Sequence, residues 1–99
     1  MGILTDLIGR GENGKKEDVD FLMGQLTSDS SIAMTRFVDY ALSFVRNPEG
    51  VERMEYYLFN GTLMQRNYCT LYFNRKGDWE TVRRAFKRGL IDEIQAFSR

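Results

Sequence analysis

The sequence predicts an all-α protein built from five or six short helices. Three observations indicate this class: apolar residues recur every three or four positions along most of the chain, no stretch alternates apolar and polar residues over the length of a strand, and the one proline stands where a helix would start. The short connections between the predicted helices favour antiparallel hairpins, arranged as a bundle or as a helical-repeat-like stack.

The length of 99 residues suits one compact domain preceded by an arm. The arm starts with an apolar helical face made of Ile3, Leu4, Leu7 and Ile8. A glycine-rich run follows over residues 9–14 and favours a tether. We therefore expect residues 1–14 to form a flexible amino-terminal arm and residues 15–99 to form a single helical domain.

Three helices are predicted in the first part of that domain. The first has apolar residues at positions 19, 22, 23 and 26. Glu17 and Asp18 precede them and indicate where this helix starts, because acidic side chains are favoured at a helix amino terminus. Residues 27–30 offer several caps for a second helix, whose apolar positions are Met34, Phe37, Val38, Ala41, Phe44 and Val45. Asn47 and Pro48 begin a short third helix, with Val51, Met54 and Leu58 facing inward.

The rest of the chain is predicted to hold three more helices. The third helix is predicted to end at Asn60-Gly61 in a left-handed conformation. A capping box of Thr62 and Gln65 then starts a fourth helix, which runs to Gly77. Its inward-facing residues are Met64, Tyr68, Leu71 and Tyr72. Asp78 caps a fifth helix, which ends at Gly89 and has an apolar face of Trp79, Val82 and Phe86. Residues 90–99 are predicted to cover one end of the core through Ile91, Ile94 and Phe97.

Composition excludes several classes of function. The chain has no histidine and one cysteine, Cys69, so it has no internal disulfide, no usual zinc, copper or haem ligand set, and no Ser-His or Cys-His nucleophile pair. Neither the lone thiol nor the carboxylate pairs Glu52/Glu55 and Asp92/Glu93 differ from ordinary buried or surface residues. We therefore expect no metal, no cofactor and no enzymatic activity.

Two short motifs have structural explanations. Gly9 to Gly14 matches the G-x-G-x-x-G pattern of dinucleotide-binding proteins, but no strand precedes it and acidic residues follow it, so a linker is favoured. Asn60-Gly61-Thr62 matches a glycosylation sequon, which the helix boundary explains better. The first eight residues have neither the basic start of a signal peptide nor the length of a membrane span, which predicts a cytoplasmic protein with no membrane partner.

A basic cluster is the strongest functional signal. The chain holds 14 Lys and Arg against 14 Asp and Glu, but residues 61–90 hold seven basic and two acidic side chains. The candidate partner-binding residues are Arg83, Arg84, Lys87 and Arg88, with Arg75 and Lys76 at the entry of their helix. Such a face could bind phosphate, an acidic protein or the acidic half of a second copy. The other interpretation is that these charges only keep the helix soluble, with Glu80 paired to Arg83 or Arg84.

Six aromatic residues crowd into positions 56–73, and base stacking and core packing are the two interpretations of this cluster. Residues 73–90 resemble the second half of a tetratricopeptide hairpin, through Phe73, Gly77, Trp79, Phe86 and Gly89. Arg66, Thr70 and Ile94 depart from the family's pattern, and no second copy follows at its repeat length. The resemblance implies a helical surface that binds a partner.

The sequence therefore predicts a small non-catalytic protein-interaction or scaffold module, which associates with another protein or with itself. The alternative is a nucleic-acid-binding accessory protein that uses the same basic face together with Arg66. A third interpretation, a ligand pocket or an unrecognised enzyme, requires an internal cavity lined by polar groups.

Overall fold

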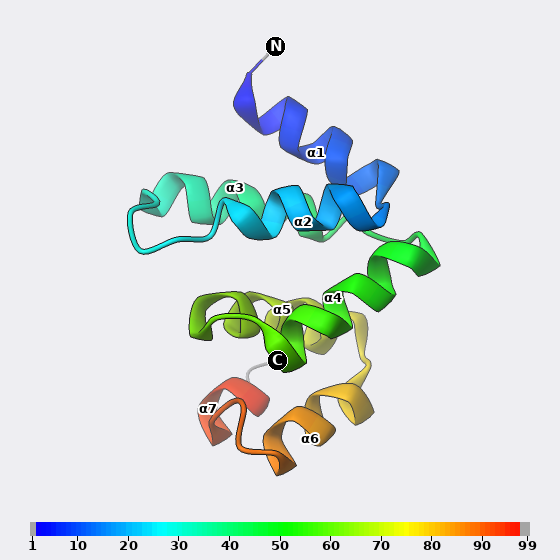
Figure 1. Cartoon of the computed structure of the whole chain (residues 1–99), viewed down its shortest axis with the longest axis vertical. Coiled ribbons are helices and arrows are strands. Elements are labelled where there is room, and N and C mark those ends of the chain that lie inside the picture. Colours follow the sequence, from blue (N-terminus) through cyan, green and yellow to red (C-terminus); the bar gives the residue numbers. More distant parts are fainter. Residues whose placement is uncertain (1, 98–99) are drawn as a thin grey trace. The chain divides into compact units, whose positions relative to one another are not determined.

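The computed structural model describes residues 2–97, and all regular structure in that range is helical, which confirms the all-α prediction (Figure 1). Seven helices are described where five or six were expected. They are α1 (Ile3–Asn13), α2 (Lys16–Gly24), α3 (Ile32–Leu42), α4 (Pro48–Asn60), α5 (Leu63–Lys76), α6 (Trp79–Lys87) and α7 (Glu93–Ala96). They group into two compact units, the first ending at Met54 and the second starting at Glu55, so the division falls inside α4.

In the first unit, α1 lies within the residues of the predicted arm. It packs mainly against α3, and Leu7 on its apolar face is buried in the core of the unit. The helix expected from the apolar spacing of residues 3–8 continues through the glycines, because Gly9 and Gly11 both lie within α1. Residues 3–13 thus form a packed helix, because α3 offers α1 an apolar surface, while the flexibility expected of residues 1–14 stays a prediction.

The glycine-rich run has a structural role in this packing. A Cβ atom at Gly11 would lie 2.0 Å from the carbonyl oxygen of Ala41, so only glycine lets α1 approach α3 so closely. Gly14 ends α1 with a left-handed φ of 63° and donates its N–H to the carbonyl of Arg10 at 2.9 Å. Two of the three motif glycines are therefore needed for folding.

Polar contacts fix the start of α2 and its position beside α4. The buried carboxylate of Asp18 accepts hydrogen bonds from the backbone N–H of Lys15 at 3.1 Å and from the side chain of Asn13 at 2.6 Å. Arg53 of α4 donates to Asp20 of α2 at 2.7 Å. These bonds anchor α2 within the first unit while Val19, Leu22, Met23 and Leu26 are buried, as their spacing predicted.

Most predicted helix boundaries are confirmed. Pro48 opens α4, Thr62 and Gln65 form the predicted capping box, and Gly77 and Gly89 adopt left-handed conformations after α5 and α6. Two details differ: Ser31, rather than a residue of 27–30, caps α3, and Gly61 has no positive φ. Glycine is needed at position 61 because a Cβ atom there would lie 2.6 Å from the carbonyl oxygen of Tyr57.

In the second unit, α5 packs against α6 and α7, and α6 packs against α7. Its core contains Leu58, Cys69, Phe73, Val82, Ala85 and Ile91. The tail was expected to cover this core through Ile91, Ile94 and Phe97, but Ile94 and Phe97 are exposed, and Ala96 is buried beside Ile91 instead. That part of the prediction was wrong, and its last two residues, 98 and 99, lie outside the described residues.

Candidate functional site

Helix α6 carries most of the predicted site residues, and its start is fixed locally. Asp78 accepts hydrogen bonds from the backbone N–H of Thr81 at 3.3 Å and from its hydroxyl at 2.8 Å. Thr81, Val82 and Ala85 are buried, which turns the arginines and Lys87 outward. The helix therefore presents two flanks, one toward α4 and one toward α7.

The flank toward α4 brings two of the predicted cations together. Arg84 donates to Glu55 at 3.2 Å, and the guanidinium groups of Arg84 and Arg88 each lie 5.3 Å from the centre of the Phe59 ring. Both arginines therefore pack α6 against the end of α4 through cation–π contacts. This use of the two side chains was not predicted from the sequence, because Phe59 is 25 residues or more away along the chain.

The other four predicted cations occupy separate places. Arg83 is paired with Glu80 at 2.8 Å, as the sequence predicted, Lys76 lies over the Tyr72 ring at 5.6 Å, and Arg75 donates to the carbonyl oxygen of Leu71 at 3.2 Å. Lys87 is exposed at the last turn of α6. The six cations thus lie on different flanks of α5 and α6 and make separate local contacts.

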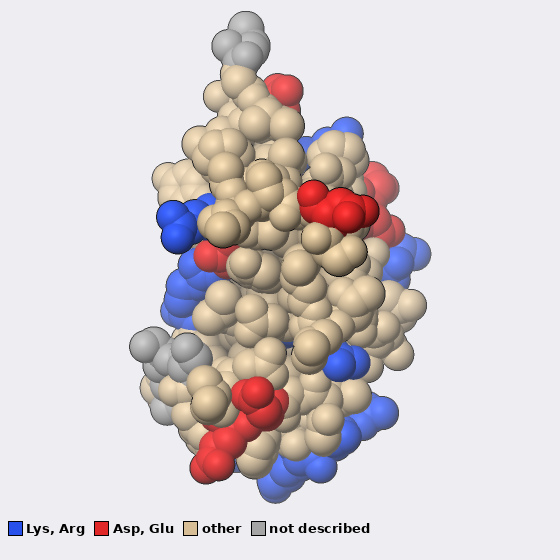
Figure 2. Space-filling view, turned by 90° about the vertical axis from the view of Figure 1, so that its left-hand side faces the viewer, with Lys and Arg blue, Asp and Glu red and all other residues tan. Residues whose placement is uncertain are grey.

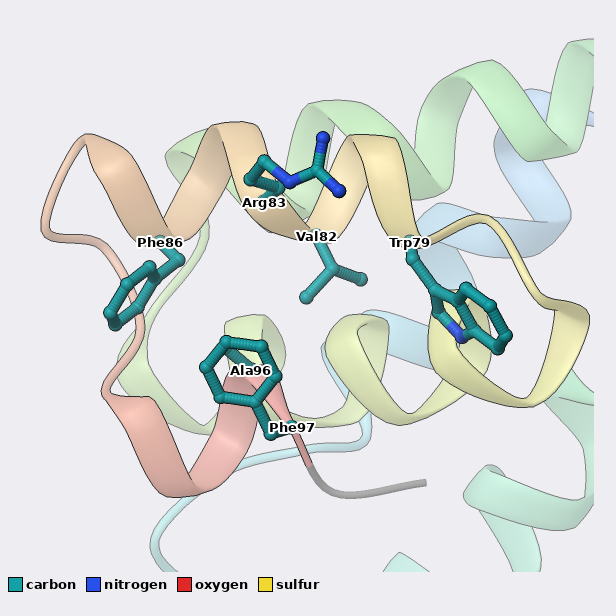
Figure 3. A pocket seen from close by; sticks show the side chains of 6 residues that line it. All are labelled: Trp79, Val82, Arg83, Phe86, Ala96 and Phe97. Atoms are coloured by element: carbon teal, nitrogen blue, oxygen red, sulfur yellow. The ribbon is translucent and has the colours of Figure 1, made fainter.

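The flank toward α7 forms a pocket that sequence reasoning missed. Its volume is about 60 Å³, and it is lined by Trp79, Val82, Arg83, Phe86, Ala96 and Phe97. Figure 3 shows Val82 pointing into the hollow, the rings of Trp79, Phe86 and Phe97 around it, and the guanidinium of Arg83 directed away along α6. The pocket therefore combines the aromatic and aliphatic side chains of five residues with one cationic side chain at its rim, and its surface is partly polar.

The position of α7 determines the wall formed by Ala96 and Phe97. The side chain of Asn74 on α5 donates to the carbonyl oxygens of Gln95 at 3.2 Å and Ala96 at 3.3 Å, and Gln95 donates to Asn67 at 3.1 Å. These bonds turn Ala96 inward and bring the Phe97 ring to 5.9 Å from the Phe86 ring. They also leave Ile94 on the outer face of α7.

The aromatic rings of the pocket are unusually accessible for their size. Trp79 is 47% exposed and Phe97 is 59% exposed, while Phe86 is half-buried. Large apolar side chains gathered around a hollow and left in contact with water are typical of binding surfaces. On the face shown in Figure 2, the region of α6 and α7 carries Lys and Arg side chains with a group of Asp and Glu near them.

The chemistry available in this unit is limited. Burial raises the pKa of the Cys69 thiol far above its ordinary value of 9.0, which keeps the sulfur protonated and poorly nucleophilic. Over residues 2–97, no three side chains of the metal-ligating types lie close enough to hold an ion. Among the same residues, no helix combines the length and the apolar character of a membrane span.

No protein-family model, curated protein or solved structure matches this chain. The tetratricopeptide resemblance of residues 73–90 stays a prediction. Within that segment Phe73 is buried, Gly77 is left-handed, and Trp79 and Phe86 line the pocket.

Proposed function

We propose that this chain is a non-catalytic protein-interaction module and that its partner docks at the pocket between α6 and α7. The observation that carries the proposal is the set of partly exposed aromatic rings around one hollow, with Arg83 at the rim. Aromatic residues, tryptophan above all, and arginine are the residue types enriched in the core of protein interfaces.

The size of the pocket favours a side chain over a small molecule. Small-molecule sites enclose about 300–1,000 Å³, whereas this pocket encloses about 60 Å³. A volume of that kind holds about four to six water-sized probes, at about 10–15 Å³ each. A single aliphatic side chain with about four carbon atoms fits it, and a cofactor does not.

The charge around the pocket favours an acidic partner. Arg83 lines the pocket, and Lys87 lies one turn further along the same helix. The Arg83–Glu80 pair is exposed, with 59% and 68% of the two side chains accessible, so exchanging Glu80 for a partner's carboxylate costs little. The proposed partner therefore presents an apolar side chain flanked by Asp or Glu.

Selection from a displayed library of random short peptides tests this proposal with the whole chain as bait. We expect enrichment of peptides with one aliphatic residue next to carboxylates. The variant Arg83→Glu should bind these peptides with lower affinity. The control Arg36→Glu, which replaces an exposed cation of α3, should bind them with unchanged affinity. Peptides that bind both variants equally, or no enrichment at all, would contradict the proposal.

The nucleic-acid alternative is an outcome of a parallel measurement on the basic side chains of α6. Arg84→Glu with Lys87→Glu would abolish binding of a single-stranded oligonucleotide, and the logarithm of the affinity would fall by about 0.7 per log unit of salt for each phosphate neutralised. Such a result, without peptide enrichment, would replace the proposed function by the alternative.

A further inference from the structure

We infer that the pocket between α6 and α7 is filled by Ile94 of a second copy of this chain, so that two copies exchange this side chain in a symmetric dimer. The inference rests on the proposed function and names its partner. The juxtaposition behind it is an exposed isoleucine next to carboxylates on α7. The same short helix supplies one wall of a pocket that is lined by aromatic rings and has an arginine at its rim.

The exposure of Ile94 is the first step. This side chain is 82% exposed, more than any other large apolar side chain among the described residues. The hydrogen bonds of Asn74 to the carbonyls of Gln95 and Ala96 hold α7 in this orientation. Ile94 is absent from the lining of its own pocket, so within one copy it fills no cavity.

Size and charge match Ile94 to the pocket of another copy. Its side chain has four carbon atoms, which suits a hollow of about 60 Å³ whose lining includes Val82, Ala96 and three aromatic rings. Glu93 precedes it and is exposed, whereas the carboxylate of Asp92 accepts the N–H of Gln95 at 2.7 Å as the cap of α7. Glu93 is therefore the carboxylate that can pair with Arg83 across the interface.

Symmetry favours Ile94 over the other exposed isoleucines. Because the pocket and Ile94 both involve α7, a two-fold axis lets each copy give one side chain and receive one, which closes the assembly as a dimer. Ile32, which is 74% exposed, belongs to the first unit. Ile32 lies on α3 and shares no helix with the pocket, so its position does not pair it with that pocket in a two-fold contact.

The charge distribution near the pocket agrees with this exchange. In the region of α6 and α7, Figure 2 shows acidic and basic side chains near each other, with uncharged side chains between them. A two-fold operation on such a surface places the basic group of one copy opposite the acidic group of the other. Charge complementarity of this kind fixes register and partner choice.

Sedimentation equilibrium of the full chain over a wide range of concentrations tests the inference. We expect a reversible dimer whose dissociation constant rises about one-hundred- to ten-thousandfold in Ile94→Asp, the loss that follows from exposing the two isoleucines that a symmetric dimer buries. Ile32→Asp is the matched control, because it places the same charge on an equally accessible isoleucine, and it should leave the constant unchanged. Circular dichroism checks that both variants keep their helix content.

A charge exchange provides the second arm. Arg83→Glu and Glu93→Arg should each weaken the dimer, and the double variant should restore most of the lost affinity because it rebuilds the pair with its signs reversed. A second report comes from Trp79, the one tryptophan of the chain, whose emission should shift to shorter wavelength as concentration rises.

The outcomes separate this inference from the proposed function. A chain that stays monomeric at every concentration, or a dimer that Ile94→Asp leaves intact, overturns the inference. If the selected peptides still bind at Arg83 in that case, the interaction module stands and its partner is another protein. If the selection also fails, both proposals fall.

Discussion

Gly11 is the residue at which the packing of α1 on α3 tolerates no side chain. A Cβ atom there would lie 2.0 Å from the backbone oxygen of Ala41, and backbone cannot move aside as the end of a flexible side chain can. We predict that Gly11→Ala lowers the free energy of unfolding by about 1–3 kcal/mol, the usual cost of overpacking. Urea unfolding followed by circular dichroism measures this change.

Gly9→Ala is the control for that prediction. Gly9 lies on the same helix, and a Cβ atom there would meet nothing within 4 Å. Alanine is the better helix former by up to about 1 kcal/mol, so this variant should gain stability. Equal effects of the two substitutions would contradict a close approach of the two helices at Gly11.

Cys69 gives a pH-dependent prediction at the same scale. Burial raises the pKa of its thiol above 9.0, so above that pH the unfolded chain releases a proton that the folded chain keeps. The contribution to stability is full below pH 9.0 and is lost as pH rises further, at up to about 1.4 kcal/mol per pH unit. We predict that the wild type loses stability more steeply than Cys69→Ala in alkaline urea titrations; parallel curves would show an accessible thiol.

At the scale of elements, Asp78 controls the start of α6. Its carboxylate accepts two hydrogen bonds from Thr81, so Asp78→Ala should lower the free energy of unfolding by about 1 kcal/mol. Asp78→Asn keeps an acceptor oxygen and should retain most of that stability. Urea unfolding distinguishes the two variants, and an equal loss in both would mean that the negative charge, rather than the cap, stabilises the helix.

The contact of α6 with the end of α4 depends on the Phe59 ring. Arg88 lies 5.3 Å from that ring, so the two side chains should be coupled by about 0.5–1 kcal/mol. A double-mutant cycle of Phe59→Leu and Arg88→Gln measures this coupling directly. Additive losses would mean that the stacking contributes nothing and that Arg88 is available to a partner.

Local signals predicted the elements well, and contacts between elements explain what they missed. The capping box of Thr62 and Gln65 involves residues three positions apart, so the sequence contains the whole feature. The orientation of α7 depends instead on hydrogen bonds from Asn74, 21 and 22 residues away, to main-chain oxygens that carry no sequence signature. The predicted inward direction of Ile94 therefore failed, and the pocket walled by Ala96 and Phe97 could not be anticipated.

For the whole molecule, the division into two units was equally hidden in the sequence. The boundary after Met54 lies within α4, whose apolar residues Val51, Met54 and Leu58 keep helical spacing straight across it. No glycine, proline or polar run marks the position. The charge does change there: six Lys and Arg against nine Asp and Glu up to Met54, and eight against five from Glu55 onward.

The continuous helix α4 should couple the unfolding of the two units. Each unit holds about half of a helix of 13 residues, and a segment of that length is not stable by itself, since isolated helices need about 12–15 residues. Unfolding of either unit therefore removes the continuation of the helix in the other. We predict that circular dichroism, which reports all helices, and the fluorescence of Trp79, which reports the second unit, follow one urea transition.

Inserting two glycines between Met54 and Glu55 tests that coupling. Each glycine costs about 1 kcal/mol of helix stability, and together they interrupt the helix at the boundary while leaving the buried Met54 and Leu58 in place within their own units. The two signals should then separate, with the fluorescence reporting the second unit alone. Signals already separate in the wild type would mean that α4 transmits no stability between the units, and the pocket of α6 and α7 would then belong to a part of the chain that folds independently.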